Sequence, residues 1–292
     1  MSPLIEGIVA YPVTPFTESD TVDTTRLHAL VDTLVASGVH AIAPLGSTGE
    51  SAYLDDREWN TVVDATVAAV NGRVPVVVGA SDLTTANTIR RARYAEQAGA
   101  DSVMVLPVSY WKLSEREIAT HYAAVAGSIG IPVMVYNNPA TSGIDMSPEL
   151  LFELFRIIEN VTMVKESTGD ITRMHRLAEL SGGELPFFNG SNPLVLKALQ
   201  AGASGWCTAA PCLRPQACVD LLTAVRSGQL DTAQEIYDDL APLLEFIVAG
   251  GLPTTVKAGL DLLGRGVGYP RGPLLPLDDH DRAVLSLLLH TA

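Results

Sequence analysis

The 292-residue chain has few cysteines, few basic residues and no long apolar segment. The three cysteines are odd in number and form no CxxC pair, which predicts reduced, intracellular thiols without a disulfide framework. No run approaches the roughly 18 apolar residues of a membrane span. The first residues also lack the basic and apolar regions of a signal peptide, so we expect a cytoplasmic protein with no membrane partner.

Basic charge is scarce: Lys and Arg total 19 against 33 Asp and Glu, which gives a formal charge of −14. A chain this acidic is a poor electrostatic partner for a phosphate backbone, so nucleic-acid binding is disfavoured. A small anionic substrate stays compatible with the sequence, because the local field at a site matters more than the net charge.

Motifs for metals and phosphates are also missing. The six histidines form neither HxH nor HExxH, and no histidine lies among the three cysteines, so no metal site is predicted. Neither GxGxxG nor GxxxxGK[ST] occurs, so the common phosphate-binding loops are absent as well.

Eight apolar segments, each followed by a segment with helical periodicity, are what the chain does contain. The expected strands cover residues 5–13, 40–45, 74–79, 101–106, 132–136, 161–165, 186–189 and 204–208. Start signals for helices include Asp23, the capping box of Ser114 and Glu117, Ser147 before a proline, and Asn192 before a proline.

This alternation predicts an α/β fold. Eight β-then-α units with near-continuous apolar strands favour a (β/α)8 TIM barrel, and a doubly wound open sheet is the alternative. Further helices are expected at 229–248, 254–263 and 278–290, around a Gly/Pro-rich stretch at 264–276. We therefore expect a barrel over residues 1–226 and a C-terminal helical extension over residues 227–292.

Lys165 is the residue that points most directly to chemistry. Of the four lysines, only Lys165 ends an apolar strand, where barrel enzymes place their active sites. An amine held there is desolvated, which favours the neutral nucleophile that Schiff-base chemistry with a ketone requires. The structural alternative is a lysine paired with a carboxylate at the barrel mouth.

Two neighbouring strand ends supply polar groups. Tyr136 ends the preceding strand, where its phenol can transfer protons, although a packing role is the alternative. Ser47 and Thr48 lie between glycines after the second strand, where hydroxyl and N–H groups suit a carboxylate; an ordinary turn is the alternative.

Three segments together resemble the dihydrodipicolinate synthase / N-acetylneuraminate lyase family of class I aldolases: GSTGES at 46–51, YNNP at 136–139 and KESTGD at 165–170. The resemblance implies a barrel with C-terminal helices and a homotetramer, a dimer of dimers. It also implies a Schiff base between Lys165 and pyruvate or another 2-keto acid, with no separate cofactor.

The same resemblance assigns roles to further residues. Tyr136 is implied as the general acid/base, Ser47 and Thr48 as carboxylate ligands, and Gly190 and Cys207 as part of the pyruvate pocket. In many members a tyrosine from a neighbouring subunit completes a hydroxyl relay with Tyr136 and the first hydroxyl of the turn, here Ser47. The candidate in this chain is Tyr110.

The sequence departs from the family pattern at a position that binds the second substrate in the synthases. The synthases place an arginine two residues beyond the proline of the tyrosine motif, where it binds the carboxylate of aspartate semialdehyde; this chain has Thr141. A threonine cannot replace a bidentate guanidinium. The positions of the allosteric lysine site also fail to match, so we expect no inhibition by lysine. They hold Asp56, Trp59, Leu83 and Asn87.

The leading hypothesis is a lyase that condenses, cleaves or dehydrates a 2-keto-3-deoxy acid through a Lys165 Schiff base. Thr141, Ser142 and Ser167 are then candidates for binding a polyhydroxylated partner. One alternative is an authentic 4-hydroxy-tetrahydrodipicolinate synthase. Another is a catalytically silent binding or regulatory protein on the same barrel, although such a protein usually loses its lysine or tyrosine.

Overall fold

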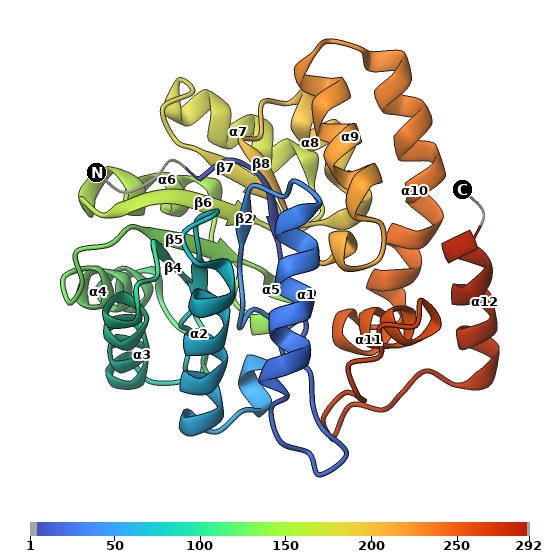
Figure 1. Cartoon of the computed structure of the whole chain (residues 1–292). Helices are drawn as coiled ribbons and strands as arrows, with labels where there is room; N and C mark the ends of the chain where they lie inside the picture. Colours follow the sequence, from blue (N-terminus) through green and yellow to red (C-terminus); the bar gives the residue numbers. More distant parts are fainter. Residues whose placement is uncertain (1–4, 291–292) are drawn as a thin grey trace.

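Eight parallel strands form the inner wall of the computed structural model, which describes residues 5–290 (Figure 1). Their order is β2-β1-β8-β7-β6-β5-β4-β3, and a parallel bridge between Ile42 and Val76 brings the two outer strands together. The sheet therefore curls into a (β/α)8 barrel, which confirms the predicted fold and excludes the open sheet.

The strands are shorter than the apolar runs that predict them. They are β1 (Gly7–Ala10), β2 (Ala41–Ile42), β3 (Val77–Gly79), β4 (Ser102–Val105), β5 (Val133–Asn137), β6 (Val161–Glu166), β7 (Phe187–Asn189) and β8 (Gly205–Thr208). Residues 11–16 and 43–46 stay buried although they have left the strand ladder. The apolar runs are longer than the strands because apolar composition indicates burial. Here burial continues into the loops at the carboxyl ends of β1 and β2.

Helices cover the outside of the barrel. They are α1 (Thr24–Ala36), α2 (Asp56–Val70), α3 (Thr85–Ala98), α4 (Glu115–Ala126), α6 (Pro148–Ile157), α7 (Ile171–Ser181), α8 (Val195–Gln200) and α9 (Pro215–Arg226). Asp23 and Ser147 cap α1 and α6 as predicted, and the capping box of Ser114 and Glu117 starts α4.

The predicted cap at Asn192 is wrong. Asn192 begins the short 3₁₀ turn η2 (Asn192–Leu194), and α8 starts at Val195 without a side-chain cap. The Asn192 side chain accepts a hydrogen bond from the Thr208 hydroxyl at 2.8 Å instead. Three short turns of helix at strand ends were not predicted: η1 (Ser51–Tyr53), α5 (Pro139–Ser142) and η3 (Ala210–Cys212).

Three C-terminal helices, α10 (Leu230–Ala249), α11 (Leu252–Leu262) and α12 (Asp279–His290), pack beside α9 at one side of the barrel (Figure 1). A buried ion pair ties them to the barrel: Lys257 Nζ of α11 lies 2.6 Å from Glu50 Oε1, with the two side chains 1% and 0% exposed. The sequence gives Lys257 no role beyond helical periodicity, because its partner lies about 200 residues away in the chain.

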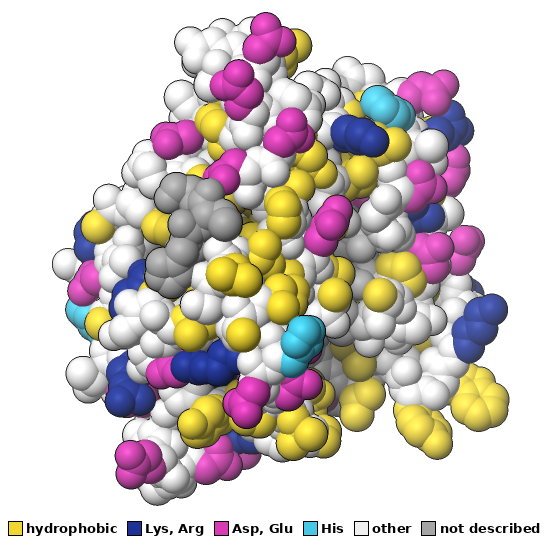
Figure 2. Space-filling view, turned by 90° about the vertical axis from the view of Figure 1, so that its right-hand side faces the viewer, with side chains coloured by type: hydrophobic (Ala, Val, Ile, Leu, Met, Phe, Trp, Pro, Cys, Tyr) yellow, Lys and Arg dark blue, Asp and Glu magenta, His cyan; other side chains and the backbone are white. Residues whose placement is uncertain are grey.

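On the face that Figure 2 shows, basic side chains lie scattered among acidic ones and do not gather in one patch. Within residues 5–290, no helix is both long and apolar enough to cross a membrane.

Candidate active site

A cavity of about 360 Å³ lies at the carboxyl ends of the strands. Seven of the eight predicted site residues line it: Ser47, Thr48, Tyr136, Thr141, Lys165, Gly190 and Cys207. Strand-end positions far apart in sequence therefore converge at one place, as expected for a barrel.

Lys165 enters the cavity from the end of β6, where it pairs with Tyr136 of β5 and Phe188 of β7. Its side chain is 5% exposed, and its Nζ lies 4.0 Å from the centre of the Tyr136 ring. Among the described residues, Lys165 forms no ion pair with a carboxylate, in contrast to Lys257. The structural alternative, a lysine paired with a carboxylate, does not fit this geometry.

A buried polar network holds the ends of β5 and β6. Glu166 is fully buried, accepts a hydrogen bond from Asn137 Nδ2 at 3.0 Å and pairs with Arg173 Nε at 3.3 Å. Because Asn137 and Glu166 directly follow Tyr136 and Lys165, the network fixes the phenol and the amine side by side.

The Tyr136 hydroxyl has a defined donor and acceptor role. Asn138 Nδ2 donates a hydrogen bond to it at 2.8 Å. A hydroxyl that accepts a hydrogen bond from an amide can still donate its own proton. Tyr136 lines the cavity, so it can donate that proton to a molecule bound there. This is the arrangement that a general acid beside Lys165 requires.

The turn after β2 presents Ser47 and Thr48 to the cavity. Leu45 and Glu50 flank it in the left-handed backbone region, with φ of 64° and 56°, so the turn is sharply constrained. Within the described part of the chain, the N–H groups of Ser47 and Thr48 donate to no protein acceptor. Two free N–H groups and two hydroxyls suit a carboxylate.

Gly190 leaves the space that Lys165 occupies. A Cβ at this position would lie 1.8 Å from Ser167 Oγ and 2.8 Å from Lys165 Cε. We expect Gly190→Ala to displace the lysine and lower the rate of Schiff-base formation about a hundredfold, because small misplacements of a reacting group have such effects. Borohydride trapping with pyruvate measures this rate.

Gly130→Ala is the control for that substitution, because its Cβ would meet only the end of the Glu96 side chain, at 3.3 Å. An unchanged trapping rate in Gly190→Ala would show that Lys165 does not need this space.

Tyr110 does not line the cavity of its own chain. Its side chain is 98% exposed, and the neighbouring Trp111 is 79% exposed. Its role across a subunit interface stays a prediction. Ser142 is also absent from the wall, and its hydroxyl bonds to backbone groups of Asn138 and Ile144.

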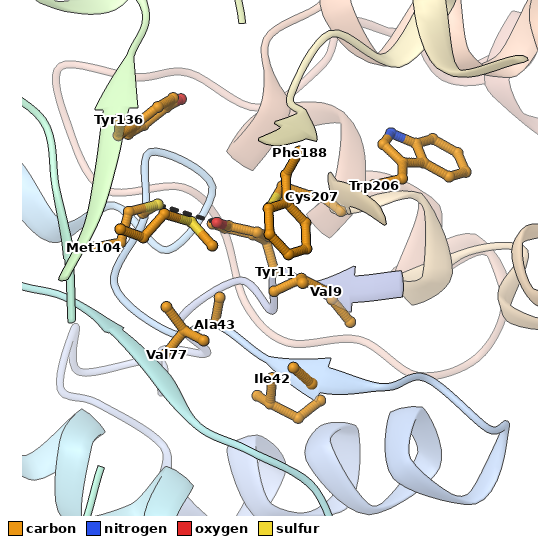
Figure 3. Packing of buried hydrophobic residues seen from close by; sticks show 14 of the residues in the cluster. Val9, Tyr11, Ile42, Ala43, Val77, Met104, Tyr136, Phe188, Trp206 and Cys207 are labelled. Carbon is orange, nitrogen blue, oxygen red and sulfur yellow. Dashed lines mark hydrogen bonds between the residues drawn. The ribbon is translucent and has the colours of Figure 1, made fainter. Parts of the chain in front are cut away.

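Several cavity residues were missed by sequence reasoning. The start of α11 and the end of α10 contribute part of the wall, so the C-terminal helices border the site. These missed residues are Tyr11, Thr208, Ala209, Val248, Gly251, Leu252 and Pro253. The ring centre of Tyr11 lies 3.9 Å from Lys165 Nζ. Figure 3 shows its hydroxyl directed at Met104.

Cys207 is a free, buried thiol in the same wall. Burial raises its pKa, although the nearby Lys165 and the Tyr11 hydroxyl oppose that shift. The thiol therefore stays protonated near neutral pH and is a lining group. Within residues 5–290, no group of three or more His, Cys, Asp or Glu side chains is placed to hold a metal ion.

Of the four positions compared above with the lysine effector site, only Asp56 carries a charge. Asp56 lies 2.6 Å from Arg90 and 3.7 Å from Arg91, and the Arg91 guanidinium lies 5.5 Å from the centre of the Trp59 ring. Leu83 is 65% exposed. The absence of inhibition by lysine stays a prediction.

Known proteins share this architecture along the whole chain. The model of the Dihydrodipicolinate synthetase family matches residues 4–292. The 4-hydroxy-tetrahydrodipicolinate synthase of Bartonella bacilliformis is 32% identical over 289 residues, covering 99% of this chain and 98% of the relative. That of Methanoculleus marisnigri is 34% identical over 283 residues, covering 96% of both. The crystal structure of a putative dihydrodipicolinate synthetase from Pseudomonas aeruginosa is 55% identical, with a TM-score of 0.97 over 98% of this chain and 99% of that one.

Fold, site and relatives together define a barrel enzyme of the class I aldolase type, a lyase that works through a Schiff base. The chain belongs to the dihydrodipicolinate synthetase family.

Proposed function

We propose that Lys165 forms a Schiff base with pyruvate or another 2-keto acid. The observation that carries this proposal is a buried amine, without a carboxylate partner among the described residues, that faces a cavity beside a phenol. The enzyme then condenses, cleaves or dehydrates a 2-keto-3-deoxy acid. No separate cofactor is needed, because the iminium itself withdraws electrons from the adjacent carbon.

Each site residue has a role in this proposal. Ser47 and Thr48 bind the keto-acid carboxylate, which places the carbonyl carbon against Lys165 Nζ. Tyr136, positioned by Asn138, gives a proton to the carbonyl oxygen and takes one back from the Lys165 nitrogen as the carbinolamine forms. It later gives a proton to the departing or accepting oxygen. Gly190 and Cys207 enclose the keto acid.

The second substrate follows from what lines the rest of the cavity. Among the described residues that line the cavity, Lys165 is the only one with a charged side chain, and Thr141 takes the place of the synthases' arginine. Hydroxyl and amide groups are plentiful, and the buried Ser167 hydroxyl has no hydrogen-bond partner within residues 5–290. A polyhydroxylated partner fits these groups better than a semialdehyde with a second carboxylate.

Authentic 4-hydroxy-tetrahydrodipicolinate synthase is the second candidate, and the names of the relatives favour it. A silent binding protein is less compatible with the chain, because both Lys165 and Tyr136 are present in the cavity.

An assay with pyruvate and aspartate semialdehyde separates the first two candidates. We expect little turnover by the wild-type enzyme, because no guanidinium lines the cavity to bind the semialdehyde carboxylate. Thr141→Arg is expected to raise kcat/KM for the semialdehyde about tenfold or more, since charge-assisted hydrogen bonds are strong. Thr141→Lys is the matched control, because lysine supplies the positive charge without the two parallel N–H donors of a guanidinium. Rapid turnover by the wild-type enzyme would refute the inference from Thr141.

We further propose a cytoplasmic homotetramer, a dimer of dimers, in which Tyr110 reaches the neighbouring subunit. The almost complete exposure of Tyr110, next to an exposed Trp111, supports this role, because aromatic residues are enriched at interfaces.

A further inference from the structure

The ring of Tyr11 lies against the Lys165 amine. Tyr11 comes from the end of β1, whereas β5 and β7 are the strands that flank Lys165. It directly follows β1, its N–H donates to Thr208 O at 2.9 Å, and its side chain is 2% exposed. Lys165 Nζ lies 3.9 Å from the Tyr11 ring centre and 4.0 Å from that of Tyr136. Both distances are well within the reach of a cation–π interaction.

The rings are the groups that the structure offers to a positive charge on this nitrogen. Among the described residues that line the cavity there is no Asp or Glu, and Lys165 forms no ion pair. The other buried lysine, Lys257, has Glu50 at 2.6 Å. A positive charge on Lys165 is therefore stabilised by aromatic ring faces, whereas a positive charge on Lys257 is stabilised by a carboxylate.

The ring has a fixed place. Its hydroxyl donates a hydrogen bond to Met104 Sδ at 3.0 Å, as Figure 3 shows, and a Cβ at Gly46 would lie 2.8 Å from the ring. Burial, then the neighbouring Cys207, raise the pKa of Tyr11 well above its usual value. The phenol stays neutral and anchored, so it is a poor proton carrier, in contrast to Tyr136.

We propose that Tyr11 is a catalytic residue whose ring face stabilises the iminium cation at Lys165, and the proposal rests on the Schiff-base function above. The Lys165 lone pair forms a bond to C2 of the keto acid, and a proton shift from nitrogen to oxygen gives a neutral carbinolamine. Protonation of that hydroxyl and loss of water leave the iminium. The ring stabilises the cation and not the carbinolamine, so it shifts the balance between these two bound species.

Carbon NMR with [2-¹³C]pyruvate measures that balance directly, because the two species differ in hybridisation at the labelled carbon. We expect Tyr11→Leu to lower the ratio of iminium to carbinolamine about tenfold, whereas Tyr11→Phe, which keeps the ring, stays within about twofold of wild type. Phe187→Leu is the matched control, because Phe187 is a buried aromatic residue of β7 outside the cavity wall.

A second comparison, between two rings of the same shape, keeps the test valid if the Tyr11→Leu variant misfolds. Pentafluorophenylalanine at position 11 has the shape of phenylalanine without its electron-rich face, and it is expected to lower the ratio as leucine does. The role of Tyr11 would be overturned by equal iminium-to-carbinolamine ratios for phenylalanine and pentafluorophenylalanine at position 11. A ratio in Tyr11→Leu within twofold of wild type would overturn it as well. Absence of any labelled adduct on the wild-type enzyme would instead refute the Schiff-base function, and the role of Tyr11 with it.

Discussion

Lys165→Ala is expected to lower the exchange of pyruvate C3 hydrogens with D₂O by about 10⁴-fold or more, as removal of a covalent catalyst typically does. The enamine that exchanges these hydrogens forms only after the amine has joined the keto acid. No second amine can substitute, because Lys257 is buried against Glu50 and no other lysine lines the cavity. Proton NMR of pyruvate in D₂O measures the exchange and needs no knowledge of the second substrate.

Lys197→Ala is the control for this experiment. Lys197 lies on the exposed surface of α8, outside the cavity, so its loss is expected to leave exchange unchanged. Exchange in Lys165→Ala at a rate near wild type would exclude the amine from the reaction.

Tyr136→Phe is expected to slow the same exchange by about 10²- to 10³-fold, the size of effect usual for loss of a general acid/base. The phenyl ring would still pack beside Lys165 Nζ, so the adduct should form, but slowly. The exchange rate and the time course of borohydride trapping together distinguish slow proton transfer from loss of the adduct.

Tyr94→Phe provides the matched control for the hydroxyl. Tyr94 lies on α3, donates a hydrogen bond to Asp64 Oδ2 at 2.8 Å and is not among the described residues that line the cavity. Its substitution is expected to cost about 1 kcal/mol of stability and no activity. If Tyr136→Phe slowed exchange no more than Tyr94→Phe, the phenol would have no role in proton transfer.

The sequence predicts the barrel and seven residues of the cavity wall, because these depend on local patterns. Period and capping residues identify the βα units, and the rule that barrel sites lie at strand ends then selects Lys165, Tyr136 and the turn at Ser47. These residues could be found one strand at a time.

Tyr11 and Lys257 could not be found in this way. Tyr11 lies in the first apolar run, where an aromatic residue is ordinary, and its contact with Lys165 spans 154 positions of sequence. In the sequence, Lys257 is one residue within a helical periodicity, and nothing there indicates that Glu50 faces it. The part played by α10 and α11 in the cavity wall likewise depends on how the C-terminal helices fold back on the barrel. Such contacts are set by tertiary packing, which periodicity does not encode.

Borohydride reduction of the wild-type enzyme in the presence of pyruvate, followed by peptide mass mapping, tests the Schiff base most directly. We expect one pyruvate-derived adduct, on the peptide that contains Lys165, and none in Lys165→Ala. An enzyme that turns over its substrate without any adduct, or an adduct on another lysine, would contradict this expectation.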